Sequence, residues 1–495
     1  MDDSAVVAAP EQTGANHLLG LVADGVGRRR SIFDRLDALE AGVRRGLRRL
    51  CVVLLLLPLA ALVMRRVPDL IVHPFVVWYG MLVLVVTLAL FFMALTRYED
   101  PSDPRFAHLP AVDDTPPLPM VPRVSMLLAV MNEIEIIDRC VASIVTSDYP
   151  NLEVVIVDDA STDGTAARLR ELAATHDFTL IELSENVGKK RALVQAAQAC
   201  TGDVIAFTDS DCVLAPNAIR RCVAAMVMNP RLGAVSGHAR ALNANATVLT
   251  KVQDSWYDGS FRVVKGAEAT VGSVSCVSGP LAVFRRDAIW NYFPAWANDR
   301  FLGAEFRFAT DRQLTGYVLG QLWVGRRLKE RFTGTSFVDT VDYPERRWDV
   351  GYVRSAEVWT VVPETYRAFL RQQIRWKKSF IRNLCFTGTF MWRRGFAATG
   401  LYYGHALWVL AAPFMAVGHL IVAPALGLWA LAGLYLAGSL LKGCLWAGVY
   451  ALENPGSDKW KYRPLMSVVS SVVLSWLLPY SAATLRRSVW VRGVS

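Results

Sequence analysis

Apolar residues collect into long runs near both ends of the chain and leave a middle of mixed character. A helix needs about 20 mostly apolar residues to cross a bilayer. One of the runs, Cys51–Met64, is shorter than that and needs flanking residues to span. The runs are Cys51–Met64, Ile71–Leu95, Leu401–Ala423, Leu426–Tyr450 and Pro464–Ala483. We therefore expect a transmembrane helical hairpin over residues 48–97 and further transmembrane helices over residues 398–495.

The middle of the chain alternates short apolar runs with helical stretches. Val124–Met131, Val154–Asp158 and Val204–Thr208 are apolar runs that lead into polar or acidic residues. Helical patterns over Ala166–Ala174 and Arg191–Ala199 lie between them. This alternation predicts a parallel sheet covered by helices, and ligands of such sheets bind at the carboxyl ends of the strands. We expect one soluble α/β domain over residues 123–362.

The connecting segments have patterns of their own. Residues 1–47 are polar and rich in Ala and Gly, then basic, which predicts a disordered N-terminal segment. Residues 98–122 are rich in Pro and Asp, as linkers are. Residues 363–397 open with a helix over Pro363–Leu384 that combines apolar positions at helical spacing with many Arg and Lys residues. Such a basic amphipathic helix is typical of segments that lie along a membrane interface.

The net charge of +9 points to a membrane rather than to nucleic acid, because the basic clusters adjoin the apolar runs. These clusters include residues 28–30, 44–45, 48–49, 393–394 and 486–487. Clusters in such places orient membrane proteins and contact lipid headgroups. We expect membrane lipids as partners, no nucleic acid, and the N-terminus and the α/β domain on the cytosolic side of the plasma membrane.

Two further features bear on the location of the chain. The eight cysteines lack C-x-x-C spacing, which argues against a disulfide framework or a zinc site and is compatible with a reducing compartment.

The basic clusters near the C-terminus conflict with a single membrane crossing of the last apolar run. The cluster at Lys459, Lys461 and Arg463 favours the same side as the cluster at Arg486, Arg487 and Arg492. A single crossing between the two clusters cannot satisfy both.

Acidic residues follow two of the predicted strands. Asp209-Ser210-Asp211 ends one strand, and such a D-x-D pair at a strand end suits Mg²⁺ or Mn²⁺ bridging a diphosphate. Asp159 ends the strand before it, where a carboxylate accepts hydrogen bonds from a nucleotide, while Asp163 is expected to cap the next helix. The alternative for Asp159 is that it, too, serves only as a cap.

Two further sites carry candidate chemistry. Gly188-Lys189-Lys190 opens a helix, where a diphosphate can meet lysines and the helix N-terminus, or where the charges simply face solvent. Asp311 lies in a semi-apolar stretch and is either a general base or an ion-pair partner of Arg312 or Arg307.

The helix over Pro363–Leu384 brings Gln372, Arg375 and Trp376 together. Arg375 is suited to clamping a diphosphate and Trp376 to stacking on a sugar ring. The alternative is that the helix is a plain interfacial anchor with an aromatic residue at the membrane surface.

Taken together, these motifs resemble the processive family-2 glycosyltransferases, a group that includes the hyaluronan, chitin and cellulose synthases and the rhizobial chitin-oligosaccharide synthases. The likeness runs from about Val124 to Leu384. It is closest to hyaluronan synthase in Ser278-Gly279-Pro280-Leu281, in Phe301-Leu302-Gly303 ahead of Asp311-Arg312, and in the segment from Arg371 to Phe380. The resemblance implies a GT-A-type mixed, mainly parallel sheet embedded between transmembrane helices, with amphipathic interface helices.

The same resemblance implies roles for the candidate residues. Asp159 with Lys189 or Lys190 would bind the UDP moiety, Asp209 and Asp211 the metal, and Asp311 would be the general base. Gln372, Arg375 and Trp376 would hold the diphosphate and the acceptor sugar, and Arg312 would also contact substrate. The implied activity is a hexosyltransferase that polymerises a polysaccharide from UDP-GlcNAc, alone or alternating with UDP-glucuronate. The growing polysaccharide is then the acceptor and leaves through a channel formed by the membrane helices.

Three residues depart from the family pattern. Met131 stands where an aromatic residue usually packs on the uracil, Thr310 where an acid usually precedes Asp311, and Phe306 where a cysteine is usual. Because two of these lie near the acceptor, they weaken an expectation of hyaluronan as the product. A chitin-like synthase, a non-processive transferase acting on a lipid carrier, and a catalytically inactive channel remain as alternatives.

Overall fold

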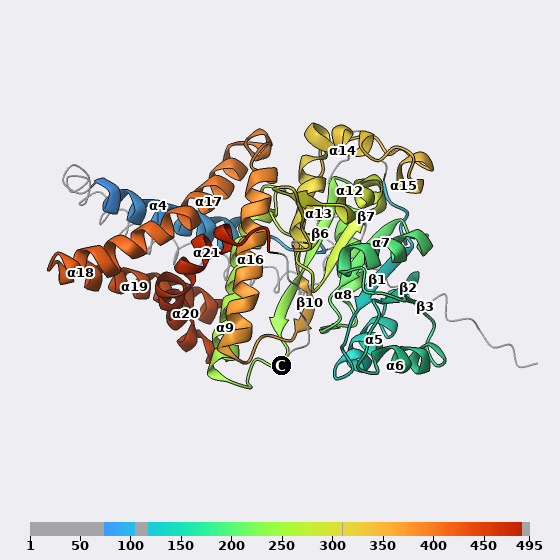
Figure 1. Ribbon diagram of the computed structural model, residues 1–495, viewed down its shortest axis with the longest axis horizontal. Coiled ribbons are helices and arrows are strands. Elements are labelled where there is room, and N and C mark those ends of the chain that lie inside the picture. Colours follow the sequence, from blue (N-terminus) through green and yellow to red (C-terminus); the bar gives the residue numbers. More distant parts are fainter. Residues whose placement is uncertain (1–73, 104–116, 309, 488–495) are drawn as a thin grey trace, which may run out of the picture.

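The computed structural model describes residues 74–103, 117–308 and 310–487 (Figure 1). The predicted disordered segment, the apolar run Cys51–Met64 and the middle of the predicted linker lie outside the described residues. In Figure 1 the helices near the two ends of the chain gather on one side, and the sheet with its covering helices forms the other. The long helix α16 (Tyr366–Thr387) runs between the two halves.

An eight-stranded mixed sheet with strand order β3-β2-β1-β4-β7-β6-β10-β5 forms the centre of the domain. The strands β1, β2, β3 and β4 are mutually parallel, as the strand-helix alternation predicts, and β7 runs antiparallel to its neighbours β4 and β6. The strands are β1 (Val124–Val130), β2 (Leu152–Asp158), β3 (Thr179–Glu182), β4 (Val204–Thr208), β5 (Cys212–Leu214), β6 (Leu232–Ala241), β7 (Ala282–Arg285) and β10 (Asp349–Thr360). A small hairpin, β8 (Arg300–Phe301) with β9 (Ala304–Glu305), lies apart from this sheet.

The central strands are buried on both faces because helices cover them. All residues of β1 and β4 are buried, so their continuous apolar runs face packed helices and not water. The covering helices include α5 (Ile137–Val145), α6 (Thr165–Ala173), α7 (Lys189–Ala199), α8 (Ala218–Met228), α9 (Val248–Asp258), α12 (Phe293–Ala297) and α13 (Thr310–Gly320). Shorter helices, α10 (Gly266–Ala269), α11 (Arg286–Ile289), α14 (Arg326–Glu330) and α15 (Ser336–Asp339), complete the domain.

Among the described residues, four helical segments are long and apolar enough to cross a membrane, one ahead of the domain and three after it. They are Trp78–Arg97, Phe396–Ala425, Trp429–Glu453 and Lys459–Ala483. The corresponding helices are α4 (Pro74–Phe92), α17 (Phe396–Val417) with α18 (Ala423–Ala425), α19 (Trp429–Glu453), and α20 (Arg463–Val472) with α21 (Leu477–Ala483). The last segment is broken by a 3₁₀ turn at Leu474–Trp476. The chain is therefore a membrane protein, and the four described segments overlap four of the five apolar runs of the sequence. The fifth run, Cys51–Met64, lies outside the described residues and stays a prediction.

Helix α16 forms as predicted, but its basic residues do not all face outward. Thr365 caps it by accepting a hydrogen bond from the N–H of Ala368 at 3.3 Å. The buried guanidinium of Arg382 pairs with Asp299 at 2.6 Å. The buried ammonium of Lys378 donates to the carbonyl oxygen of Thr484 at 2.7 Å. The helix thus packs between the domain and the membrane helices and does not lie only on the membrane surface.

Candidate active site

A cavity of about 1150 Å³ lies between the carboxyl edge of the sheet, helix α16 and the membrane helices. The cavity brings together predicted site residues that are more than 200 positions apart in the chain, such as Asp159 and Trp376. Its lining includes Asp159, Lys189, Asp209, Asp211, Asp311, Arg312, Gln372, Arg375 and Trp376. Of the predicted substrate and metal residues, all but Lys190 therefore reach one space.

Asp159 follows β2 and holds the loop that leads into α7. Its carboxylate accepts hydrogen bonds from the backbone N–H groups of Val187 at 2.7 Å and Gly188 at 2.9 Å. Burial raises the pKa of Asp159 above its ordinary value, and these two hydrogen bonds oppose that rise. Gly188 has a φ of +85°, a conformation that favours glycine over other residues. The carboxylate thus fixes the N-terminus of α7 and still lines the cavity.

The two lysines at the start of α7 lie on different sides of the helix. The ammonium of Lys189 forms an ion pair with Asp209 in the cavity. The ammonium of Lys190 is buried, and it donates to Gln313 Oε1 at 2.6 Å and to the carbonyl oxygen of Phe306 at 2.9 Å. Burial lowers the pKa of Lys190 to about 8, and the carboxylate of Asp299 opposes that fall. The structure therefore places Lys189 at the candidate donor site and Lys190 in the core beneath it.

Asp209 and Asp211 at the end of β4 offer the oxygens that a hard divalent cation prefers. Ligand atoms of Asp209, Asp211 and Cys212 lie within 4.8 Å of one another. Burial raises the pKa of the Cys212 thiol well above its usual value, so this sulfur stays protonated and is a poor ligand. The two carboxylates and the adjoining Lys189 fit a Mg²⁺ or Mn²⁺ ion that carries a diphosphate.

Asp311 lies in the first turn of α13, facing the cavity. Its carboxylate accepts hydrogen bonds from the N–H groups of Arg312 at 2.8 Å and Gly279 at 3.3 Å, and the thiol of Cys276 lies 3.5 Å from it. The ion-pair alternative does not hold for Arg307, whose guanidinium contacts Glu305 at 3.2 Å. Asp311 is therefore held by backbone groups and a thiol, and keeps lone pairs for a proton from a substrate.

Arg312 lies beside Asp311 and lines the cavity at the boundary with the membrane helices. It also borders a small secondary cavity with Glu268, Ser275 and Tyr402. Its charge therefore faces both the candidate reaction centre and the start of the membrane-embedded part. This position is compatible with the expected contact to substrate.

Helix α16 carries Gln372, Arg375 and Trp376 into the cavity, where aromatic residues of α9 meet them. The ring centroid of Trp376 lies 5.6 Å from that of Trp256 and 6.0 Å from that of Tyr257. Trp376 remains 39% exposed, so the cluster presents a ring face to the cavity. Neither Trp256 nor Tyr257 was expected at the site. The only sequence feature that could have indicated them is the pair of adjacent aromatic residues in Ser255-Trp256-Tyr257-Asp258.

The membrane helices line the far part of the same cavity with polar groups. Hydroxyls come from Ser439 of α19 and from Ser467, Ser470 and Ser471 of α20. The hydroxyls of Ser439 and Ser471 are hydrogen-bonded at 2.9 Å. Trp408 and Lys442 face the cavity too, with the ammonium 4.9 Å from the indole centroid. Polar side chains between apolar helices are rare and usually functional.

Comparison with known proteins points in the same direction. Residues 125–293 match the model of glycosyl transferase family 2. An N-acetylglucosaminyltransferase of Azorhizobium caulinodans is 32% identical over 270 residues, which cover 54% of this chain and 62% of the relative. One of Rhizobium meliloti is 33% identical, covering 53% and 57%. The chain thus spans less than two thirds of the length of these relatives.

Two further similarities cover more of the chain. A hyaluronan synthase of Streptococcus pyogenes is 26% identical over 355 residues, which cover 70% of this chain and 77% of the synthase. Among solved structures, a mannosyltransferase from Pyrobaculum calidifontis in complex with GDP-Man and Mn²⁺ has a TM-score of 0.46 at 22% identity. That likeness covers 82% of this chain and 98% of the mannosyltransferase.

Proposed function

We propose that the chain, whose residues 125–293 match the model of glycosyl transferase family 2, is a processive, inverting polysaccharide synthase. It takes UDP-sugars from the cytosol, namely UDP-GlcNAc alone or in alternation with UDP-glucuronate, and passes the polymer across the plasma membrane. One observation carries this proposal. A single cavity extends from Asp209 and Asp211, past Asp311 and Trp376, to serines of the membrane helices.

At the donor end, each side chain has a task that its position supports. Asp159 fixes the loop before α7 and faces the nucleotide, and Lys189 faces the diphosphate. Asp209 and Asp211 would hold Mg²⁺ or Mn²⁺, which neutralises the charge that develops on the leaving UDP. Arg375 adds a second cation opposite, on α16.

At the acceptor, Asp311 takes the proton of the terminal hydroxyl. The hydroxyl oxygen bonds to the anomeric carbon of the donor sugar, and the bond from that carbon to the diphosphate oxygen breaks. Attack from the face opposite to the leaving group inverts the anomeric configuration. Trp376, with Trp256 beside it, offers a ring face on which the terminal acceptor sugar stacks. After transfer, the lengthened chain must advance by one sugar, and the membrane-lined part of the cavity is the space open to it.

The decisive experiment is a screen of UDP-sugars, singly and in pairs, with the purified full chain and Mg²⁺ or Mn²⁺. UDP release together with long polymer, measured by mass analysis, is the expected result. Failure of every UDP-sugar to yield either product would refute the proposal. The identity of the productive donor or pair also decides between a hyaluronan-like and a chitin-like product.

A second candidate function is the transfer of a single sugar to a lipid carrier. The observation in its favour is that the cavity is bordered by membrane helices, so that a lipid phosphate has access in principle. The residues of α16 favour the polymerase, because Gln372 and Trp376 meet the aromatic residues of α9 at the position of a sugar acceptor. A product that carries one sugar on lipid would reverse this choice.

A further inference from the structure

Helix α9 continues into a π-helical segment, Gly259–Lys265, that lies between membrane helix α19 and the reaction centre. A Cβ atom at Gly259 would lie 3.1 Å from the ring of Trp446, so the glycine permits close contact with α19. π-Helical turns often occur at functional sites. This one ends at Lys265, a buried lysine that no motif in the sequence singles out.

The ammonium of Lys265 holds one loop. It donates to the backbone oxygen of Cys276, to the hydroxyl of Ser278 at 2.7 Å and to the hydroxyl of Ser236 at 3.2 Å. Three contacts match the three donor protons of an ammonium group. The side chain also lies 4.6 Å from the ring centroid of Phe261. Lys265 borders the cavity, but all three of its donor protons are directed to protein groups, so the side chain is suited to holding the loop.

The loop that Lys265 holds separates the base from the metal ligands. The N–H of Gly279 donates to Asp311 at 3.3 Å. A Cβ atom at Gly279 would lie 2.7 Å from a carboxylate oxygen of Asp209, so the loop backbone also touches the metal ligand. The carbonyl oxygen of Pro280 accepts a hydrogen bond from Thr208 at 2.7 Å. The position of this loop therefore sets the spacing between Asp311 and Asp209.

We propose that Lys265 is a positioning residue for sugar transfer, which fixes loop 276–280 and with it the separation of the base from the metal ligands. The inference rests on the proposed function of Asp311 and Asp209. The π-helix would then affect the rate of sugar transfer without contacting the donor or the acceptor.

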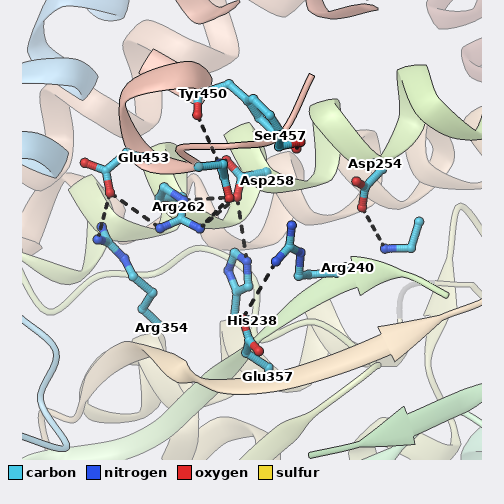
Figure 2. Close-up of polar contacts among 12 residues, drawn as sticks. His238, Arg240, Asp254, Asp258, Arg262, Arg354, Glu357, Tyr450, Glu453 and Ser457 are labelled. Atoms are coloured by element: carbon cyan, nitrogen blue, oxygen red, sulfur yellow. Dashed lines mark hydrogen bonds and ion pairs between the residues drawn. The ribbon is translucent and has the colours of Figure 1, made fainter. Parts of the chain in front are cut away.

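The opposite end of the same segment is anchored to the membrane helix by a network of charges (Figure 2). Arg262 contacts Asp258 at 3.0 Å and Glu453, the last residue of α19, at 3.5 Å. Arg354 of β10 contacts Glu453 at 3.2 Å. Glu453 and Asp258 are both almost fully buried, so these pairs are shielded from solvent screening. The π-helix thus has a fixed end at α19 from which Lys265 reaches the loop.

The test compares Lys265→Met with Lys251→Met. Lys251 lies on α9, the helix that continues into the π-helical segment, and its ammonium lies over the ring of Tyr462. Rates of UDP release are measured on the full chain in detergent with Mn²⁺ and the productive UDP-sugar. Displacement of reacting groups by about 1 Å costs on the order of 100-fold in rate. We expect Lys265→Met to lose about that factor in kcat while the KM for donor and the affinity for UDP stay unchanged. Lys251→Met should match the wild type, and Lys265→Arg should recover part of the loss.

The possible outcomes separate the two proposals. An unchanged kcat in Lys265→Met overturns the inference. A loss of kcat that is matched by lost UDP affinity and a lower unfolding temperature also overturns it, because the lysine then serves stability alone. If the wild type releases no UDP from any UDP-sugar, the proposed function fails instead, and that result is visible before any variant is made.

A second observation concerns the last apolar segment. Its start and its end both contact the domain side: Lys459 pairs with Asp254 of α9 at 2.7 Å, and Lys378 of α16 donates to the carbonyl oxygens of Thr484 and Arg487. Between these points, Ser471 of α20 meets Ser439 in the middle of α19. We infer that α20 and α21 enter the membrane to that depth and return. The basic clusters on both sides of the segment then lie on one side, as their charge requires.

Re-entrant backbone is tolerated where it lines a cavity, and the serines of α20 do so here. The test places a cysteine at the exposed Asp458 or Arg486 in a chain whose exposed Cys385 and Cys444 are serines. A membrane-impermeant thiol reagent is then applied to membrane vesicles of either orientation. Asp458→Cys and Arg486→Cys should react from the same side as Glu171→Cys, an exposed position on α6. Reaction from opposite sides, or at either position only after the membrane is dissolved, overturns the inference.

Discussion

The two ends of the cavity differ in the charge of their lining. The domain end carries carboxylates from two loops and one helix start, at Asp159, at Asp209 with Asp211, and at Asp311. The membrane helices, within the part of the chain that the structure describes, line the other end with apolar, hydroxyl, aromatic and cationic side chains and with no carboxylate. Glu268 of α10 lines the cavity between the two ends, beside Arg312 and Tyr402. Hydroxyls and aromatic faces suit a sugar chain without fixing it at one point. On the proposed function, the carboxylates would instead fix a metal and take a proton. On the proposed function, the reaction and the passage of product are therefore separate tasks of one cavity.

This difference predicts that changes at the domain end stop turnover, while changes at the membrane end alter the product.

Removal of the divalent metal should have the largest effect. Chelation with EDTA should abolish UDP release, because without a cation the carboxylates of Asp209 and Asp211 repel the equally negative leaving diphosphate. Added Mn²⁺ or Mg²⁺ should restore activity, measured as UDP release. Full activity in EDTA would remove the metal from the proposal.

Replacement of the base comes next. Asp311→Asn keeps the shape of the side chain but cannot accept the acceptor proton, so turnover should fall by about 10³-fold. UDP binding should remain, because Asp159 and Lys189 are untouched. The measurement pairs UDP release with a binding titration of UDP. Turnover at the wild-type rate would contradict the role given to Asp311.

The sequence predicted the domain end because its residues follow strands. Asp159 and Asp209 directly end apolar runs, and parallel strands bring such ends to one edge. The prediction failed to separate Lys189 from Lys190. Consecutive helix positions differ by about 100° in direction, so one lysine faces the cavity and the other the core, and charge alone does not tell which.

The membrane helices were predicted as apolar runs, and the family resemblance implied a channel among them, but no residue lining the membrane end was predicted. The α9 residues Trp256 and Tyr257 lie about 120 positions before Trp376 and meet it only through packing. The contacts of Lys459 and Thr484 with the domain depend on tertiary structure, which hydropathy does not encode. Site residues at strand ends can be predicted from short sequence motifs, whereas the residues that line a cavity between helices cannot.

Lys189 and Lys190 offer a matched pair of variants at the domain end. Lys190→Met leaves Gln313 and the carbonyl oxygen of Phe306 without their buried donor, which should lower the free energy of unfolding by about 2 kcal/mol. Lys189→Met should leave stability unchanged and weaken donor binding. Thermal unfolding and the KM for donor, measured on both variants, check the pair. Equal effects on both quantities would show that the two lysines share one role.

The aromatic cluster lies at the boundary of the two ends, and its loss should be milder. Trp256→Ala removes a ring that supports Trp376, and a stacking contact of this kind is worth about 1 kcal/mol. We expect about a fivefold to tenfold loss in kcat/KM for the acceptor, with UDP affinity unchanged. Trp392→Ala, on an exposed indole outside the cavity, is the control. A loss of UDP affinity in Trp256→Ala would place this residue at the donor instead.

Ser471→Ala, at the membrane end, should have the smallest effect on rate and is the sharpest test of the comparison. The hydroxyl bonds to that of Ser439 and faces the cavity far from Asp311, so its removal leaves the reacting groups in place. A lost neutral hydrogen bond changes the free energy by about 1 kcal/mol. If the Ser471 hydroxyl helps to hold the departing polymer, the polymer should dissociate earlier from the variant. The mean product length should then fall, while UDP release per enzyme stays within about twofold of the wild type. A fall in UDP release with unchanged length would mean that the membrane end contributes to the chemistry, and the division of tasks between the two ends would then be wrong.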